Sequence, residues 1–105
     1  MSKKVTLFYA DWCGHCVQFK PTWNELKKVF DKSNIKYEEY EDSKDEDIIA
    51  ENNIGGYPTI MIENENGKYE YSGGRDADSL LREIIGLQGG GKKLNIKKYK
   101  IIYSL

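Results

Sequence analysis

The sequence has few of the residues that build covalent or metal-held scaffolds. Its 105 residues include two cysteines, one histidine and two prolines. Two cysteines are too few for the disulfide framework of a small secreted domain, and a structural zinc site needs four ligands. We therefore expect an ordinary apolar core to stabilise the fold. A chain of 105 residues with 12% aromatic content is long enough to form one domain around such a core.

Long apolar runs and a large net charge are also absent. No segment approaches the roughly 20 apolar residues of a membrane helix, and a net charge of -1 gives no general reason to expect nucleic-acid binding. The first residues, Met1 to Lys4, are not followed by the apolar run of a signal peptide, and the last residues are not an endoplasmic-reticulum retention signal. These absences predict a cytoplasmic protein that contacts neither membrane nor nucleic acid.

Both cysteines and the histidine lie in one segment, residues 8–16. Residues 4–9 are β-branched and aromatic, which predicts a strand, and apolar residues at helical spacing follow as far as Phe30. The cysteine pair therefore lies where a strand leads into a helix, and Cys13 meets the free N–H groups of the first helical turn. Such groups stabilise a thiolate, which is the nucleophile of thiol–disulfide exchange.

The spacing of Cys13 and Cys16 favours redox chemistry over two alternatives. A permanent disulfide across so short a loop gains little stability, and two cysteines with His15 between them cannot supply four zinc ligands. We expect Cys13 to be the more exposed thiol that attacks, and Cys16, one turn deeper, to resolve the mixed disulfide. No bound cofactor is implied, because the cysteine pair is itself the redox centre.

Periodicity and turn signals predict the element order β-α-β-α-β-β-α, a mixed four-stranded sheet with helices on both faces. An Asn-Gly pair at 66–67 indicates a hairpin between the last two strands. Three glycines at 89–91 separate a domain of residues 1–88 from a linker and basic tail, 89–105. The predicted strands cover residues 4–9, 35–41, 59–63 and 68–71, and the predicted helices residues 13–31, about 48–52 and 76–87.

Three motifs resemble the thioredoxin superfamily, and the cysteine segment is most similar to a protein disulfide isomerase domain. Trp-Cys-Gly-His-Cys at 12–16 follows Phe-Tyr-Ala, Gly-Tyr-Pro-Thr-Ile occupies 56–60, and Gly-Arg-Asp-Ala-Asp occupies 74–78. The resemblance covers roughly residues 4–88 and implies a minimal thioredoxin-like fold, because the strand and helix that usually come first are missing. It also implies a cis peptide bond before Pro58, which would present the Tyr57 backbone to an extended substrate.

Residues around the cysteines have predicted roles in the same chemistry. His15, as a cation or through its ring dipole, is expected to stabilise the Cys13 thiolate and make the disulfide a better oxidant; the alternative is a surface histidine without a role. Trp12 is expected to offer substrates an apolar contact, with ordinary packing as the alternative. The predicted substrate-facing residues are Trp12, Gly14, Tyr57 and Pro58.

Three positions depart from the family pattern. Leu7 stands where the resemblance implies a buried acid that helps to deprotonate the resolving thiol, and Leu87 stands where it implies an arginine. Glu39 occupies a position on the next strand where the family commonly has a lysine. We predict that its carboxylate lies beneath the cysteines and accepts the Cys16 proton, directly or through water. The alternative is that Glu39 is one of several solvated acids on that strand.

Together these features predict a thiol–disulfide oxidoreductase that reduces, forms or exchanges disulfides in protein substrates and is recycled by an unidentified reductase or oxidase. A glutaredoxin-like, glutathione-dependent enzyme is one alternative, since Gly73 and Gly74 are similar to a glutathione-binding turn, although glycine pairs are also common in ordinary turns. A peptide-binding module that uses the tail as a docking element is another.

The tail gives the last prediction. Residues 92–105 carry five lysines and no acidic residue, among β-branched and aromatic residues. Without the usual first strand, the strand at 35–41 should form a sheet edge, whose unpaired backbone invites a partner. We predict that residues ~95–103 add to this edge; a disordered tail or a docking peptide is the alternative. The acidic residues that would face the tail are Glu38, Glu39, Glu41 and Asp42.

Overall fold

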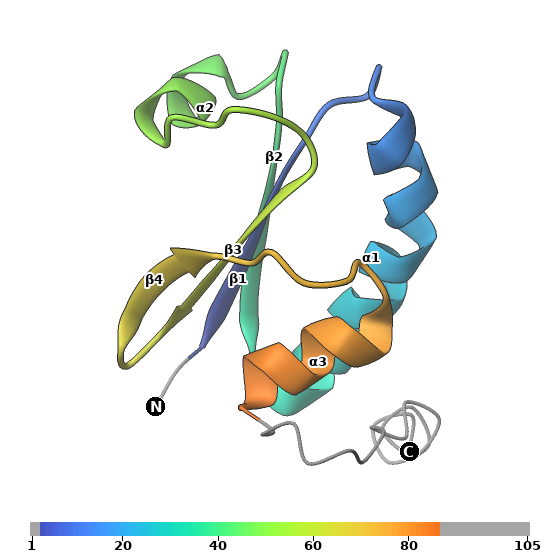
Figure 1. Ribbon diagram of the computed structural model, residues 1–105, viewed down its shortest axis with the longest axis vertical. Helices are drawn as coiled ribbons and strands as arrows, with labels where there is room; N and C mark the ends of the chain where they lie inside the picture. Colours follow the sequence, from blue (N-terminus) through green and yellow to red (C-terminus); the bar gives the residue numbers. More distant parts are fainter. Residues whose placement is uncertain (1–2, 87–105) are drawn as a thin grey trace.

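The computed structural model describes residues 3–86, which form a four-stranded sheet and three helices. Figure 1 shows α1 and α3 on one face of the sheet and α2 on the opposite side. The predicted fold class and element order are confirmed, and the predicted ends agree to within about two residues. The elements are β1 (Lys4–Tyr9), α1 (Gly14–Ser33), β2 (Lys36–Glu41), α2 (Glu46–Glu51), β3 (Thr59–Asn64), β4 (Gly67–Glu70) and α3 (Ala77–Ile85).

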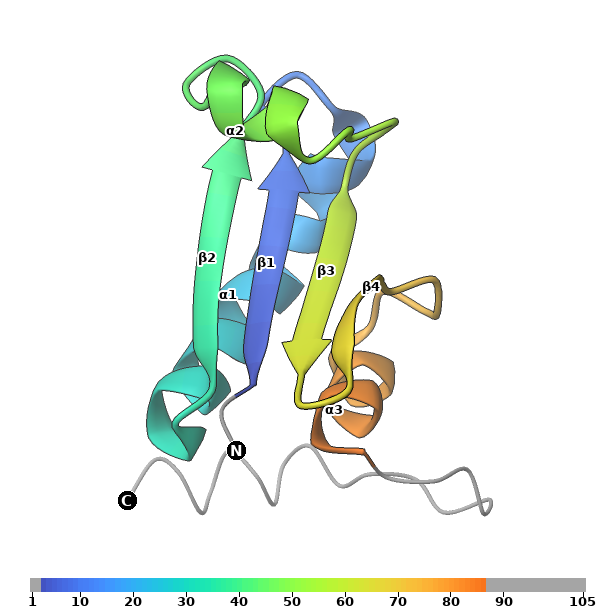
Figure 2. The ribbon, with the colours of Figure 1, turned by 90° about the vertical axis from the view of Figure 1, so that its left-hand side faces the viewer.

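The strands lie side by side in the order β2-β1-β3-β4 (Figure 2). β1 and β2 are parallel, with Tyr9 opposite Glu41, whereas β3 is antiparallel to both β1 and β4. A parallel pair needs a long crossover connection, and α1 supplies it. Because β1 is central, the cysteine segment leaves the sheet between the end of β2 and the start of β3.

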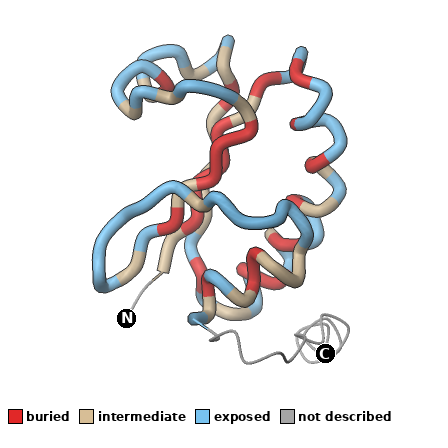
Figure 3. The backbone as a smooth tube through the Cα atoms, viewed as in Figure 1, coloured by how far each residue is buried: buried red, intermediate tan, exposed pale blue. Residues whose placement is uncertain are grey.

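The apolar core lies between the sheet and the helices α1 and α3, and the buried stretches of these elements face one another in Figure 3. Val5 and Leu7 of β1 and Ile62 of β3 are each at most 1% exposed, and Trp23 of α1 and Leu81 of α3 are completely buried. Leu7 thus packs within the core, where a carboxylate would need a partner and an apolar side chain needs none.

Within the described residues β2 forms one edge of the sheet, as the sequence predicts. The linker, the tail predicted to pair with this edge, and Leu87 lie outside the described residues. The acids of β2 already have partners: Glu38 pairs with Lys4 at 2.7 Å, and Glu39 pairs with Lys27 at 2.9 Å. The opposite charge that this strand can offer the tail is therefore smaller than the sequence alone indicates.

A buried carboxylate joins the ends of β1 and β2. Glu41 is 2% exposed and accepts the backbone N–H of Asp11 at 3.0 Å. It also accepts the hydroxyl and N–H of Ser43, at 2.6 and 2.9 Å, and the N–H of Lys44 at 3.1 Å. These bonds, the Ser43 hydroxyl first among them, lower the pKa of Glu41 to about 2. Glu41 is therefore not an acid available to the tail; it fixes the loop that leads to the cysteines.

Acidification should destabilise the fold through Glu41. A carboxyl whose pKa falls from 4.5 to about 2 on folding stabilises the folded state above pH 4.5, and this contribution is lost as the pH falls toward 2. We expect Glu41→Gln to lower the free energy of unfolding at neutral pH and to flatten its decrease between about pH 5 and about pH 2.5. Urea unfolding measures both effects, with the exposed Glu51 replaced by Gln as the control. A Glu41→Gln profile parallel to that of the unmodified protein would contradict this role.

Candidate active site

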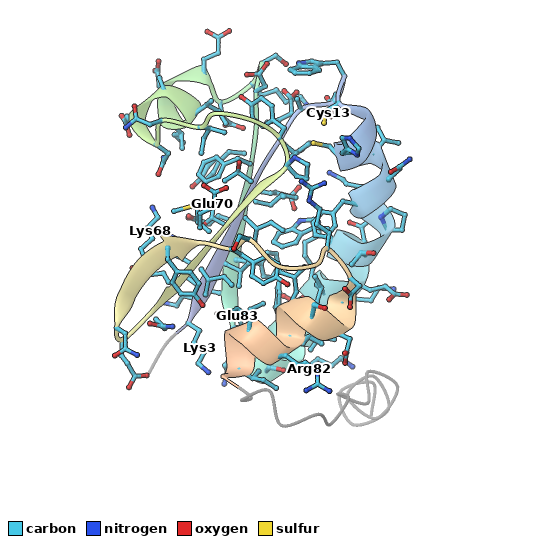
Figure 4. The ribbon with its side chains drawn as sticks, in the orientation of Figure 1. Lys3, Cys13, Lys68, Glu70, Arg82 and Glu83 are labelled. Carbon is cyan, nitrogen blue, oxygen red and sulfur yellow. The ribbon has the colours of Figure 1, made fainter. Side chains whose placement is uncertain are left out.

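The two cysteines lie at the start of α1, and Figure 4 places Cys13 at the end of the molecule where that helix begins. Cys13 is the N-cap residue of α1, with an extended backbone, and Cys16 lies in the first turn. The N–H of Cys13 donates to the carbonyl of Ala10 at 3.1 Å, and the N–H of Val17 donates to the carbonyl of Cys13 at 3.0 Å. Both cysteines are free thiols, so the turn holds a reduced pair at a helix N-terminus.

The two thiols differ more in acidity than in exposure. Cys13 is 8% exposed and Cys16 is 5% exposed, which is the predicted order but a small difference. A hydrogen bond from the Cys16 side chain, followed by the backbone N–H groups of Cys16 and His15, lowers the pKa of Cys13. Burial raises the pKa of Cys16 to about 11. Cys13 therefore ionises first and is the better nucleophile near neutral pH.

His15 and Arg75 lie near this pair. His15 contributes its backbone N–H to the Cys13 sulfur, while its side chain is exposed, so the predicted effect of the imidazole stays a prediction. Arg75 is not among the predicted site residues, yet its positive charge lowers the pKa of both thiols. Its place in the Gly-Arg motif before α3 was the available signal.

The loop before β3 borders the site on its other side. The peptide bond between Tyr57 and Pro58 is cis, as the resemblance to the thioredoxin superfamily implies. The Cys13 thiol donates to the Tyr57 carbonyl at 3.5 Å. An open cavity of about 360 Å³ adjoins this loop and is lined by Asn52 to Thr59, Met61, Glu70 and Arg75. The Tyr57 backbone thus lies beside the Cys13 sulfur.

Asp42 also contacts the site, although the sequence indicated it only as one of the acidic residues that would face the tail. Its carboxylate accepts the indole N–H of Trp12 at 3.2 Å and the hydroxyl of Tyr57 at 2.7 Å. The Trp12 and Tyr57 rings meet edge to face, with centroids 5.8 Å apart. Trp12 is 71% exposed, so ordinary core packing does not explain its position.

Glu39 lies opposite Leu7 in the sheet register, but the direct contact predicted between its carboxylate and Cys16 is not formed. One carboxylate oxygen accepts the Trp23 indole N–H and the Lys27 ammonium group, each at 2.9 Å. Burial raises the pKa of Glu39, but these bonds outweigh it and leave the pKa lowered. The donors of α1 therefore hold this carboxylate, and proton transfer through water stays a prediction.

The glycine pair before α3 has a structural explanation. A Cβ at Gly73 would lie 2.5 Å from the Tyr71 hydroxyl oxygen, which donates to the Gly74 carbonyl at 2.7 Å. A Cβ at Gly74 would lie 2.8 Å from the carboxylate of Asp76, the N-cap residue of α3. The glycines make room for the turn that starts α3, which favours an ordinary turn over a glutathione-binding one.

Residues 3–86 contain no cluster of three or more His, Cys, Asp or Glu side chains that could hold a metal ion. In the same part of the chain, no helix combines the length and apolar character needed to cross a membrane.

Comparisons with known proteins agree with this geometry. The family model described as Thioredoxin matches residues 2–85. A protein disulfide-isomerase of Schizosaccharomyces pombe is 34% identical over 106 residues, which cover 96% of this chain and 28% of the relative. A protein disulfide-isomerase of Medicago sativa is 30% identical over 99 residues, which cover 89% of this chain and 19% of the relative. The chain thus spans less than a third of the length of these relatives.

Solved structures show the same fold. The J-Trx1 fragment of ERdj5 aligns with a TM-score of 0.71 at 24% identity, covering 80% of this chain and 42% of that one. The first thioredoxin domain of mouse Protein disulfide-isomerase A4 aligns with a TM-score of 0.66 at 25% identity, covering 86% and 66%. By its sequence, its fold and the place of its cysteine pair, the chain belongs to the thioredoxin family.

Proposed function

We propose that this chain is a thiol–disulfide oxidoreductase that acts on the disulfides or thiols of protein substrates. The observation that carries the proposal is the difference between two thiols held at one helix start: the pKa of Cys13 is lowered, and that of Cys16 is raised to about 11. The relatives named protein disulfide-isomerase support the same class of reaction.

In the reducing direction, the Cys13 thiolate attacks one sulfur of a substrate disulfide. The substrate S–S bond breaks, a mixed disulfide forms with Cys13, and the other substrate sulfur leaves as a thiolate that takes up a proton. Cys16 then loses its proton and attacks the Cys13 sulfur, which releases the second substrate thiol. The pair is oxidised by two electrons as the substrate is reduced, and the reverse sequence forms a substrate disulfide.

The first step favours the second. In the free enzyme, the hydrogen bond to Cys13 and the negative charge of Cys13 both raise the pKa of Cys16. Once Cys13 is bonded to substrate, its sulfur is neutral and both effects end. The backbone N–H of Ala10 and the charge of Arg75, which lower the pKa of Cys16, remain. Cys16 therefore ionises more readily in the mixed disulfide than before it.

The direction of electron flow depends on the reduction potential of the pair. A potential near about -270 mV would suit a reductase recycled by another reductase, and one near about -180 mV would suit an oxidant or isomerase recycled by an oxidase. If the His15 side chain stabilises the Cys13 thiolate, as the sequence predicts, the potential lies toward the second value. Equilibration with glutathione buffers measures it.

The two thiols should ionise in separate pH ranges. In Cys16→Ser, we expect alkylation of Cys13 by iodoacetamide to reach half its maximum below the ordinary thiol pKa of 9; in Cys13→Ser, alkylation of Cys16 should still increase above it. The serine hydroxyl in Cys16→Ser keeps a donor beside Cys13. Equal midpoints for the two thiols would contradict the assignment of attacking and resolving residues.

Only one of the two serine variants should trap a substrate. With a peptide that contains one disulfide, we expect Cys16→Ser to accumulate at least about tenfold more mixed disulfide than Cys13→Ser, since the former can attack but not resolve. Mass spectrometry under non-reducing conditions measures the adduct, and the unmodified protein, which can resolve it, is the control. A reversed trapping pattern would mean that the two roles are exchanged.

Replacing Glu39 by Gln separates its two candidate roles. If Glu39 accepts the Cys16 proton through water, Glu39→Gln should slow the resolution of the mixed disulfide by about tenfold or more. If Glu39 only forms an ion pair, Glu39→Gln should leave the resolution rate unchanged and lower the free energy of unfolding by less than about 1 kcal/mol. The lowered pKa of Glu39 makes it a poor proton acceptor, so we expect the second result. Lys27→Met, which breaks the ion pair but keeps the carboxylate, is the control in stopped-flow assays.

A further inference from the structure

Asp42 follows β2 directly and lies between the two loops that border the cysteines. Its Oδ2 accepts the indole N–H of Trp12 at 3.2 Å, and its Oδ1 accepts the hydroxyl of Tyr57 at 2.7 Å. The N–H of Asp42 donates to the Tyr9 carbonyl at 2.9 Å, which anchors its backbone to the end of β1. The Asp42 carboxylate thus links Trp12, which precedes Cys13, to Tyr57, which precedes Pro58.

The position of the Trp12 side chain depends on this carboxylate. Trp12 is 71% exposed, and a side chain with so little burial is not fixed by the packing that holds core residues in one rotamer. The contacts that orient its ring are the hydrogen bond to Asp42 and the edge-to-face contact with Tyr57, whose ring is inclined at 86° to the indole. Without Asp42, the indole would lose its hydrogen bond and keep only the contact with the Tyr57 ring.

Tyr57 is the second residue whose side chain is bonded to Asp42. The backbone carbonyl oxygen of Tyr57 lies 3.5 Å from the Cys13 sulfur, and the side-chain hydroxyl of the same residue is bonded to Asp42. The same hydrogen bond raises the pKa of Tyr57 to about 12, so the phenol keeps its proton and remains a donor near neutral pH. Asp42 therefore influences both the surface beside the attacking sulfur and the backbone group that contacts it.

The exposed apolar side chains gather at the same place. Among the described residues, the two most exposed large hydrophobic side chains are Trp12 and Val17, at 71% and 62%. Trp12 directly precedes Cys13, and Val17 directly follows Cys16 on the first turn of α1. Apolar surface that is left open on both sides of a reactive pair suits a substrate with apolar side chains next to its disulfide.

We propose that Asp42 is a positioning residue that holds Trp12 and Tyr57 as the two sides of the substrate entrance to Cys13, and thereby favours protein substrates with apolar residues beside the reacting disulfide. The proposal rests on the proposed function and names the substrate class of the same site. Asp42 acts through Trp12 and Tyr57, whose side chains both donate to it, and no hydrogen bond joins it to a described cysteine. Its effect should therefore appear in substrate binding and not in the exchange chemistry.

Steady-state kinetics with two peptides, each with one disulfide, test the proposal. One peptide has leucine on both sides of each cysteine, and the other has glycine there. For Asp42→Ala we expect KM for the leucine peptide to rise by about threefold to tenfold, with kcat within about twofold, and KM for the glycine peptide to stay unchanged. Asp42→Asn keeps an acceptor for Trp12 and an N–H that can reach the Tyr57 oxygen, so it should restore most of the KM. Asp47→Ala, at an exposed position of α2, is the matched control.

Two further measurements separate positioning from a general loss of structure. The indole N–H signal of Trp12 in nuclear magnetic resonance spectra should exchange with water faster in Asp42→Ala, while urea unfolding stays cooperative. In a Trp12→Ala background, Asp42→Ala should raise KM for the leucine peptide by a smaller factor than it does in the otherwise unmodified protein, because the part of its effect that acts through Trp12 is already lost. Additive effects of the two substitutions on KM would contradict action through Trp12.

Equal increases in KM for both peptides, or unchanged values for both, would overturn the proposal. A protein that exchanges disulfides with neither peptide would instead overturn the proposed function. In that case, unchanged indole exchange in Asp42→Ala would still show that Asp42 does not hold Trp12.

Discussion

The arrangement of the active-site loops depends on a buried carboxylate at the end of β2. A charge removed from water needs several donors, and Glu41 finds them in the loop after β1 and in the loop after β2. The parallel register places Tyr9 opposite Glu41. A shift of one residue would turn the Glu41 side chain to the other face of the sheet and leave both loops without this link. The strand register therefore determines where Trp12, Cys13 and Asp42 lie.

The chemical difference between the cysteines arises at two levels of structure. The first level is local, because the residues around the cysteine pair form the start of α1. The backbone N–H groups there lower the pKa of Cys13. The burial that raises the pKa of Cys16, and the opposing charge of Arg75 before α3, need the assembled fold. Two identical side chains only three residues apart thus differ in acidity.

The strands, the helices and the cysteine pair could be predicted from the sequence because their signals are local. β-branched runs, helical spacing and the Asn-Gly turn each act over a few residues. The roles of Glu41 and Asp42 could not, because acids that crowd the end of one strand look alike until the register with β1 decides which is buried. The direct contact predicted between Glu39 and Cys16 is wrong for a related reason. Counting along the chain found the position of Glu39 opposite Leu7, but not the Trp23 and Lys27 donors that its carboxylate contacts.

The central place of β1 has a consequence for the newly made protein. Among the described strands, the first to be synthesised is β1, and it pairs with β2 and with β3, which ends only at Asn64. At about 5 to 20 residues per second, roughly 2 to 10 seconds separate the synthesis of Cys16 from the completion of β3. During that interval both cysteines exist without the Tyr57 carbonyl and without the sheet that later distinguishes them. We infer that a nascent chain of this protein carries two ordinary thiols, so it is most exposed to unwanted disulfides before its own site for exchanging them has formed.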